Sequence, residues 1–169
     1  MNMKNYDYLP LDKYDIRILA AMQKDNTRTH QTLGEAVHLS SSQVGRRIQR
    51  LQEAGLIAKH VALLNPSLLG LNVTAISYVT LARHGTREGD QFEESVAHIP
   101  AVLECLAVTG ECDYILKIVA SDLTALAESV LKPLTHMAGV ASVRSNIVLK
   151  RIKSSTELPL DNLGNVAYA

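Results

Sequence analysis

The sequence predicts an α+β protein of two small domains, helical at its N-terminal end and built on a β-sheet in its C-terminal part. Its 169 residues suffice for two such domains. Apolar residues recur at helical spacing up to about residue 57, whereas later apolar segments are rich in β-branched residues. We therefore expect domains at residues 1–58 and 67–155, joined by a linker strand at 59–66 and followed by a C-terminal tail at 156–169.

The first expected helix begins at Lys13, because Asp12 can cap it and Leu11 with Ile16 can form a hydrophobic staple. The polar residues that follow Lys24 interrupt the helical pattern. The apolar face of this helix is expected to comprise Tyr14, Ile18, Leu19 and Met22.

A second, shorter helix is expected from about Thr29 to His38. The turn between two such helices often requires a residue in the left-handed conformation, and His38 would have to adopt it here. Histidine tolerates that conformation better than β-branched residues do. The side chains expected to be buried are Leu33, Ala36 and Val37.

The third expected helix begins after Ser40, which forms a capping-box pattern with Gln43, and ends at Gly55. Its buried stripe is expected to be Val44, Ile48 and Leu51. The residues expected to face outward are Ser41, Ser42, Gln43, Arg46, Arg47 and Arg50. Hydroxyl, amide and guanidinium groups on one helix face can reach base edges and phosphates in the DNA major groove.

Together these helices have the outline of a DNA-binding helix-turn-helix domain, with or without a wing. An ordinary solvated helix face is the alternative explanation for the arginines alone. The chain as a whole is neutral, but residues 11–60 hold eight basic and five acidic residues, whereas residues 61–153 hold eight and nine. The cationic excess thus lies where DNA phosphates would be contacted.

The C-terminal domain is expected to have the order βαββαβ. The strands are expected at 73–81, 102–108, 114–119 and 143–152, and the helices at 88–98 and 123–136. A further short strand is expected in the linker, at 60–64. This order indicates a ferredoxin-like antiparallel sheet with both helices on one face. The other face must be covered, and a second copy of the chain is the simplest cover, so we expect a homodimer.

Other residues set limits on the function. Cys105 and Cys112 are expected to be free thiols, and no cation adjoins Cys112 to make it a redox sensor. The six histidines show no ligand spacing, so no metal site is expected. No apolar run could span a bilayer, and MNMKNYDYLP lacks the apolar core of a signal peptide. The sequence therefore predicts a cytoplasmic protein without membrane association.

The chain resembles the Lrp/AsnC family of bacterial and archaeal regulators through five segments in register: LDKYDIRIL, LSSSQVGRRIQRLQEAGLI, ALLNP, VTGECDYILK and AGVASVRSNIVLKRIK. The resemblance covers about residues 11–160 and implies a DNA-binding domain, a second domain that binds small molecules, typically amino acids, and dimers that commonly assemble to octamers. His38 departs from the family's usual glycine. Residues 161–169 extend beyond the usual end and are expected to be loosely ordered.

The loop at 109–114 is the sharpest chemical feature of the second domain. Gly110 permits close approach of backbone amides to a ligand carboxylate, and Glu111 or Asp113 can neutralise an ammonium group. A plain acidic hairpin is the alternative. The resemblance implies that this loop borders the effector pocket between neighbouring dimers, and we expect Asp113 to bind the ammonium group of the effector. The matched positions add Ala107, Thr109, Cys112, Leu123, Thr135 and Met137.

The resulting hypothesis is a sequence-specific transcriptional regulator that responds to an amino acid or related effector and needs no other cofactor. Effector binding would act on DNA affinity through the assembly of dimers. An architectural DNA-wrapping protein without an effector is the alternative, and it would show weak sequence preference. An enzyme is not expected, because Glu111 and Asp113 have no accompanying histidine, lysine or metal cluster.

Overall fold

The computed structural model describes residues 9–82, 86–160 and 163. The chain divides into two compact units, each with its own apolar core. The helical unit comprises Met1–Ala62 together with Lys153–Ala169, and the sheet unit comprises Leu63–Ile152. The C-terminal segment therefore belongs with the N-terminal helices, a feature that local sequence patterns did not reveal. Among the described residues, no helix is long and apolar enough to cross a membrane.

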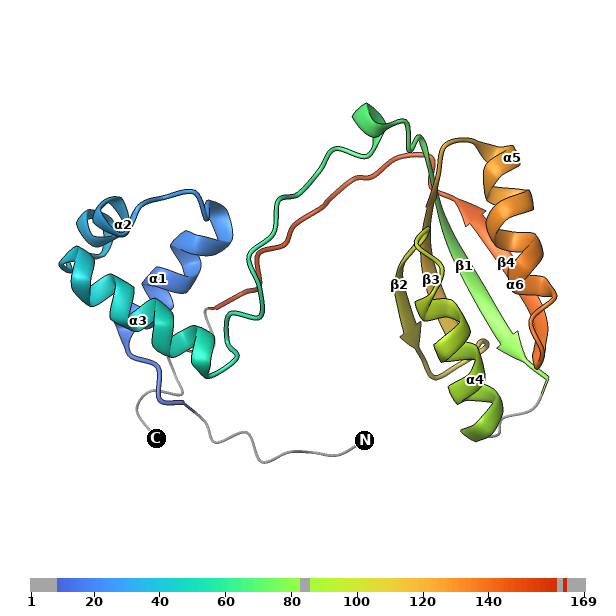
Figure 1. The fold of residues 1–169 in the computed structure, drawn as a ribbon, viewed down its shortest axis with the longest axis horizontal. Coiled ribbons are helices and arrows are strands. Elements are labelled where there is room, and N and C mark those ends of the chain that lie inside the picture. The colour runs from blue at the N-terminus through green and yellow to red at the C-terminus, as the bar shows by residue number, and fades with distance from the viewer. Residues whose placement is uncertain (1–8, 83–85, 161–162, 164–169) are drawn as a thin grey trace. The chain divides into compact units, whose positions relative to one another are not determined.

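The helical unit contains α1 (Lys13–Lys24), α2 (His30–Val37) and α3 (Ser41–Glu53) (Figure 1). The cap predicted at Asp12 and the capping box predicted at Ser40 are both present, and Asp15 extends the Asp12 cap to a full capping box. The Asp12 carboxylate accepts hydrogen bonds from the amides of Tyr14 and Asp15, at 2.8 and 2.9 Å. These caps satisfy amides that a helix leaves unpaired at its first turn, which is why both helices begin where the sequence predicts.

The turn between α2 and α3 depends on two residues. His38 adopts the predicted left-handed conformation, with φ 61° and ψ 48°. Gly34 is buried beside this turn, and a Cβ atom there would lie 2.4 Å from the Leu39 carbonyl oxygen. A side chain at position 34 would thus force α2 and the turn apart. Downstream of α3, Gly55 has φ 75° and follows the helix as predicted.

The core of the helical unit agrees with the predicted apolar stripes except at Ala36, which is exposed, and at Tyr14, which is partly buried but is not one of the side chains packed on this core. Leu33, Gly34 and Val37 form the buried stripe of α2, and Ala36 lies outside that narrow arc. The fully or largely buried apolar side chains of this core are Ile18, Leu33, Val37, Val44, Ile48 and Leu51. The carboxylic acid Asp15 is buried with them, at 0% exposure.

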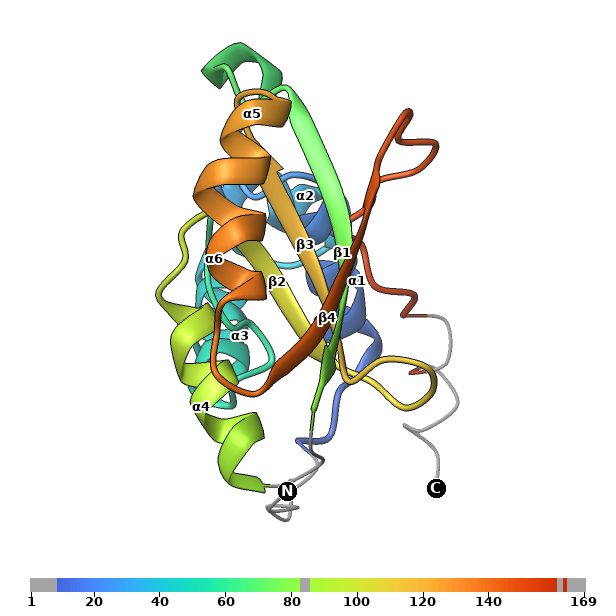
Figure 2. The ribbon, with the colours of Figure 1, turned by 90° about the vertical axis from the view of Figure 1, so that its right-hand side faces the viewer.

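The sheet unit has the predicted βαββαβ order. Its elements are β1 (Val73–Leu81), α4 (Thr86–Ala97), β2 (Val102–Ala107), β3 (Tyr114–Ala120), α5 (Leu123–Ala125), the π-helical segment η2 (Leu126–Leu131), α6 (Lys132–Thr135) and β4 (Val140–Ile147). The strands pair antiparallel in the order β2-β3-β1-β4. Figure 2 shows α4 and the α5–α6 segment on the same face of this sheet.

Side-chain burial alternates from residue to residue along β1, so the sheet has a covered face and an open face. On β1, Ala75, Ser77 and Val79 are fully buried toward the helices, whereas Ile76 and Tyr78 on the other side are only partly buried. The buried Ser77 hydroxyl is satisfied by Ser145 of β4, with 2.8 Å between the two oxygens. The open face is the side of the sheet that carries Ile76 and Tyr78.

Two strand predictions were wrong. The last strand was expected at 143–152 but is β4, Val140–Ile147, because its partner β1 extends no further than Val73. The linker strand expected at 60–64 does not form, and the described part of the helical unit contains no wing. An extended segment becomes a strand only when another chain segment satisfies its amides and carbonyls. Residues 161–162 and 164–169 of the expected loose tail lie outside the described residues.

Candidate nucleic-acid interface and effector loop

Helix α3 presents a polar surface opposite its buried stripe. Ser41, Ser42, Gln43 and Arg46 are exposed on it, as predicted. The Arg46 side chain lies along its own helix and donates through Nε to the Ser42 carbonyl oxygen at 3.4 Å. Because this bond is long and local, the guanidinium can leave it for a base edge or a phosphate at little cost.

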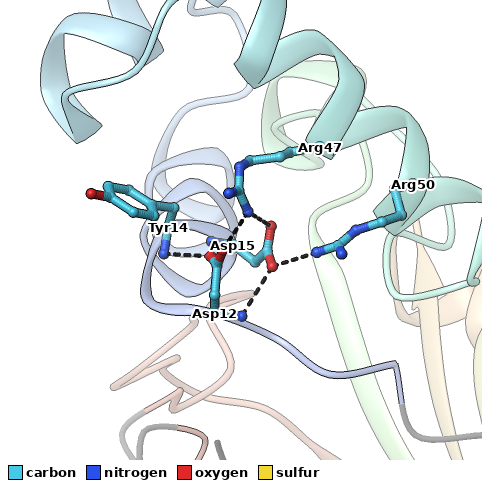
Figure 3. Close-up of polar contacts among 5 residues, drawn as sticks. All are labelled: Asp12, Tyr14, Asp15, Arg47 and Arg50. Carbon is cyan, nitrogen blue, oxygen red and sulfur yellow. Dashed lines mark hydrogen bonds and ion pairs between the residues drawn. The ribbon is translucent and has the colours of Figure 1, made fainter.

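Arg47 and Arg50 have a different environment, shown in Figure 3. Arg47 Nη1 lies 2.7 Å from Asp15 Oδ1 and 2.8 Å from Asp12 Oδ2. Arg50 Nη2 binds the second carboxylate oxygen of Asp15. Asp15 Oδ2 also accepts the Asp12 amide at 3.0 Å. Both oxygens of the buried carboxylate are therefore paired, and α3 is fastened to the start of α1 through these contacts.

The proton equilibria of this network reflect its hydrogen bonds. Burial tends to raise the pKa of Asp12, but bonds from the Asp15 amide, Arg47 and the Tyr14 amide lower it below the ordinary value. Burial tends to lower the pKa of Arg47, but its bonds to Asp15 and Asp12 raise it. The Arg47 guanidinium also lies 5.5 Å from the centre of the Tyr14 ring. The charged forms of both partners are thus favoured.

These contacts give Arg47 and Arg50 a structural role, while the DNA-reading role expected of both stays a prediction. Sequence spacing placed both arginines on a polar face but did not reveal that α1 covers part of it with a buried carboxylate. Gln49, which is not among the residues predicted from the sequence, is exposed on α3 and donates to Glu53 Oε1 at 2.8 Å. Its spacing of seven residues from Ser42 and three from Arg46 could have revealed it.

The loop between β2 and β3 is held to the end of β1 by Asp113. The Asp113 amide donates to the Val79 carbonyl at 2.9 Å, and its carboxylate accepts the Leu81 amide at 2.7 Å. Its carbonyl accepts the Val108 amide at 2.9 Å. Asp113 therefore has the structural role of the hairpin alternative. The ammonium-binding role expected for it stays a prediction.

The tip of the loop is more open than its base. Gly110 has φ 128° and no atom within 4 Å of the position a Cβ would take. Glu111 is highly exposed, and its carboxylate lies 3.8 Å from Arg144 of β4. Thr109 is also exposed, and Cys112 is a partly buried free thiol. The tip thus offers backbone amides and a weakly paired carboxylate to solvent.

The other predicted effector residues do not all lie near this loop. Thr135 and Met137 lie at and beyond the end of α6, just before β4, whose Val140 pairs with Leu81 at the end of the sheet that Asp113 of the loop also contacts. Leu123 begins α5 at the opposite end, beyond the seven residues of β3, which span about 20 Å. One copy of the chain therefore cannot bring Leu123 to the loop. A pocket containing both needs two copies.

Ala107, the last effector residue predicted, lines a cleft between α4 and the edge strand β2. The cleft has a volume of about 420 Å³. Glu93 and Tyr114 also line this cleft: the Tyr114 hydroxyl donates to Glu93 Oε1 at 2.9 Å, and burial together with this bond raises the pKa of Tyr114 to about 12. Across the described residues, His, Cys, Asp and Glu side chains do not gather in groups of three or more that could hold a metal ion.

A helix-turn-helix unit followed by a ferredoxin-like sheet unit defines a two-domain class of regulator. The AsnC-type helix-turn-helix domain matches residues 11–52, and the Lrp/AsnC ligand binding domain matches residues 74–158. The chain belongs to the Lrp/AsnC family. It is 32% identical over 151 residues to the DNA-binding transcriptional activator DecR of Escherichia coli, an alignment covering 89% of this chain and 99% of that protein.

Other relatives extend this similarity. The Leucine-responsive regulatory protein of Rhizobium meliloti is 33% identical over 150 residues, covering 89% of this chain and 96% of that protein. A transcriptional regulator of Neisseria meningitidis, solved as its L-Met complex, has a TM-score of 0.87 and 39% identity, covering 90% and 99% of the two chains. An AsnC family regulator of Agrobacterium tumefaciens has a TM-score of 0.85 and 34% identity over the same shares.

Proposed function

We propose that this protein is a sequence-specific DNA-binding transcriptional regulator whose DNA binding responds to an amino acid. The proposal rests on how α3 is held in the helical unit and on which of its faces is exposed. Its apolar stripe and two arginines are fastened to the helical unit, while a separate polar face with Arg46 and Gln49 points outward. A recognition helix needs this combination of a rigid base and an accessible polar face.

The DNA-reading set that we propose differs from the sequence prediction. Ser41, Ser42, Arg46 and Gln49 contact base edges, and Gln43 contributes to the cap through its side-chain oxygen. Arginine can bind guanine and glutamine can bind adenine through paired hydrogen bonds. Arg47 and Arg50 instead position the helix. Their exposed edges can still contact phosphates, which adds affinity without sequence preference.

We propose an amino acid as the effector, bound between copies of the chain. The similar Neisseria structure contains L-Met, which makes methionine and other apolar amino acids the first ligands to test. Backbone amides near Gly110 can receive the ligand carboxylate, and of the two carboxylates of the loop Glu111 is the more exposed and the more weakly paired. Leu123 can complete this pocket only from a second copy, because it lies at the other end of its own sheet.

The open face of the sheet supports a homodimer as the basic assembly. In the register of the strands, Leu106, Ile115 and Tyr78 form one row across this face, ending at Arg144. Leu106 is 47% exposed although it is a large apolar residue. Packing a second sheet on this row removes apolar area from water at about 25 cal/mol per Å². Further assembly of dimers, to octamers for example, would juxtapose loops and α5 ends from different copies.

Two measurements test the proposed function. DNA sites selected from a random pool by the full-length protein should share a sequence, and fluorescence anisotropy should give tighter binding to them than to scrambled DNA. A thermal-shift screen with the twenty amino acids should identify a ligand that stabilises the protein, and that ligand should change the DNA affinity. Weak sequence preference without any amino-acid response would support an architectural DNA-wrapping protein instead.

A further inference from the structure

The segment that follows the sheet unit returns to the helical unit. The sheet unit ends at Ile152, and the described residues beyond it, 153–160 and 163, group with the N-terminal helices. The helical unit is thus connected to the sheet unit at two places in the chain, once after Ala62 and once before Lys153. Residues 153–160 form neither helix nor strand, so specific side-chain contacts must account for their position. We call these residues the strap.

One side chain of α1 holds the strap. Gln23 Nε2 donates to the Leu158 carbonyl oxygen at 3.2 Å, and Gln23 Oε1 accepts the Leu158 amide at 2.7 Å. Both polar atoms of one side-chain amide therefore pair with both backbone groups of one residue, 135 positions away. This arrangement reproduces the paired hydrogen bonds that join residues of neighbouring antiparallel strands.

The surroundings of Leu158 show that its backbone makes the contact. Its side chain is 71% exposed, so apolar burial does not account for its position. The Glu157 amide donates to Ser155 Oγ at 3.0 Å, which shapes the strap just before the contact. After it, Leu160 is partly buried and its carbonyl accepts the Leu163 amide at 3.0 Å. Gln23 itself is partly buried, which favours its hydrogen bonds over those with water.

We propose that residues 153–160 are an integral strap of the DNA-binding unit, docked on α1 of the same chain through Gln23. Because α1 also holds Arg47 and Arg50 of α3 through Asp12 and Asp15, the strap connects the sheet unit to the recognition helix by packed, hydrogen-bonded elements. A second tether restricts the orientations available to the helical unit more than a single linker does. The docking of the strap does not depend on the proposed function, whereas the effect of the strap on DNA binding rests on that function.

Hydrogen exchange of the full-length protein tests the docking. Gln23→Ala removes both hydrogen bonds and leaves α1 with a good helix former, so the fold should persist. We expect peptides containing Leu158 to exchange about tenfold faster in this variant, while peptides of α1 and α3 keep their rates. Gln91→Ala is the matched control: it makes the same change at an exposed position of α4 and should leave the exchange rate of the strap unchanged. Equal rates for the strap in the wild-type protein and Gln23→Ala would overturn the docking.

Cross-linking tests whether the strap docks on its own chain. Lys24→Cys and Leu158→Cys, combined with Cys105→Ser and Cys112→Ser, preserve the Gln23 contact because Leu158 contributes only its backbone. A short bismaleimide should yield a monomer carrying an internal cross-link, identified by mass spectrometry of its joined peptides. A covalent dimer, or the absence of any 24–158 cross-link, would overturn docking within one chain.

The regulatory consequence has its own measurement. With the effector found in the screen, Gln23→Ala should keep its DNA affinity within about threefold of the wild-type value but lose at least half of the effector-induced change. An unchanged effector response would overturn the strap's role in regulation while leaving its docking intact. If the wild-type protein has no effector response, the proposed function fails, and the exchange and cross-linking results still decide the docking.

Discussion

Replacing the buried carboxylate of Asp15 should destabilise the helical unit and misplace its recognition helix. Asp15→Asn keeps the size of the side chain and one acceptor oxygen, but it removes the charge shared by Arg47 and Arg50. Removing one partner of a buried ion pair typically costs about 3–5 kcal/mol. The arginine side chains are 26% and 44% exposed and can regain water, so we expect a cost at or below the lower end of that range, about 2–3 kcal/mol.

Urea unfolding followed by far-ultraviolet circular dichroism measures this loss as a shift of the transition to lower urea. Glu35→Gln is the matched control, because it removes an exposed carboxylate of α2 whose bond to Gln31 is long, at 3.4 Å. That control should remain within about 0.5 kcal/mol of the wild-type protein. A similarly small change for Asp15→Asn would refute the inference that this carboxylate fastens α3 to α1.

The same network predicts a pH dependence. The pKa of Asp12 is lowered in the folded protein, chiefly by hydrogen bonds that overcome the opposing effect of burial. Its contribution to stability is therefore fully present above the unfolded pKa, about 4, and is lost as the pH falls through the folded value. Asp12→Asn should flatten the acid side of the stability curve of the helical unit. An unchanged acid limb in that variant would contradict the assignment.

Three further predictions concern binding. Arg46→Ala should weaken specific DNA binding by about 1–3 kcal/mol in anisotropy titrations without changing the urea midpoint. The control is Arg17→Ala, which removes the same charge from an exposed position of α1 and should preserve the sequence preference. Equal losses for both would mean that Arg46 contributes only charge. Tyr78→Glu should shift sedimentation toward a smaller species, because it places a charge at the centre of the open face. If this variant still sediments as a dimer, the dimer interface lies on another surface. Asp113→Ala leaves the buried Leu81 amide unpaired, which should cost about 1–3 kcal/mol of stability. Calorimetry on this variant would also show whether the carboxylate binds an effector, since wild-type effector affinity would restrict Asp113 to its structural role.

Features that depend on neighbouring residues in the chain could be predicted from the sequence. The caps at Asp12 and Ser40, the left-handed His38 and the strand β1 at 73–81 agree with prediction, because each depends on the residue types and hydrogen bonds of a few neighbouring residues. The order of the elements in the sheet unit followed from the same local patterns. The resemblance to a known family then added the two functions expected of the two domains.

The tertiary structure decided which polar groups remain available for function. Arg46 and Arg50 have the same chemistry and lie on the same helix, but only Arg50 meets the Asp15 carboxylate of α1. Leu123 and the loop at Gly110 match one family pocket in sequence, yet β3 holds them at opposite ends of the sheet. Gln23 and Leu158 are joined across 135 positions. Such pairings depend on how whole elements pack, and a local sequence pattern carries no information about the partner that packing brings to each side chain.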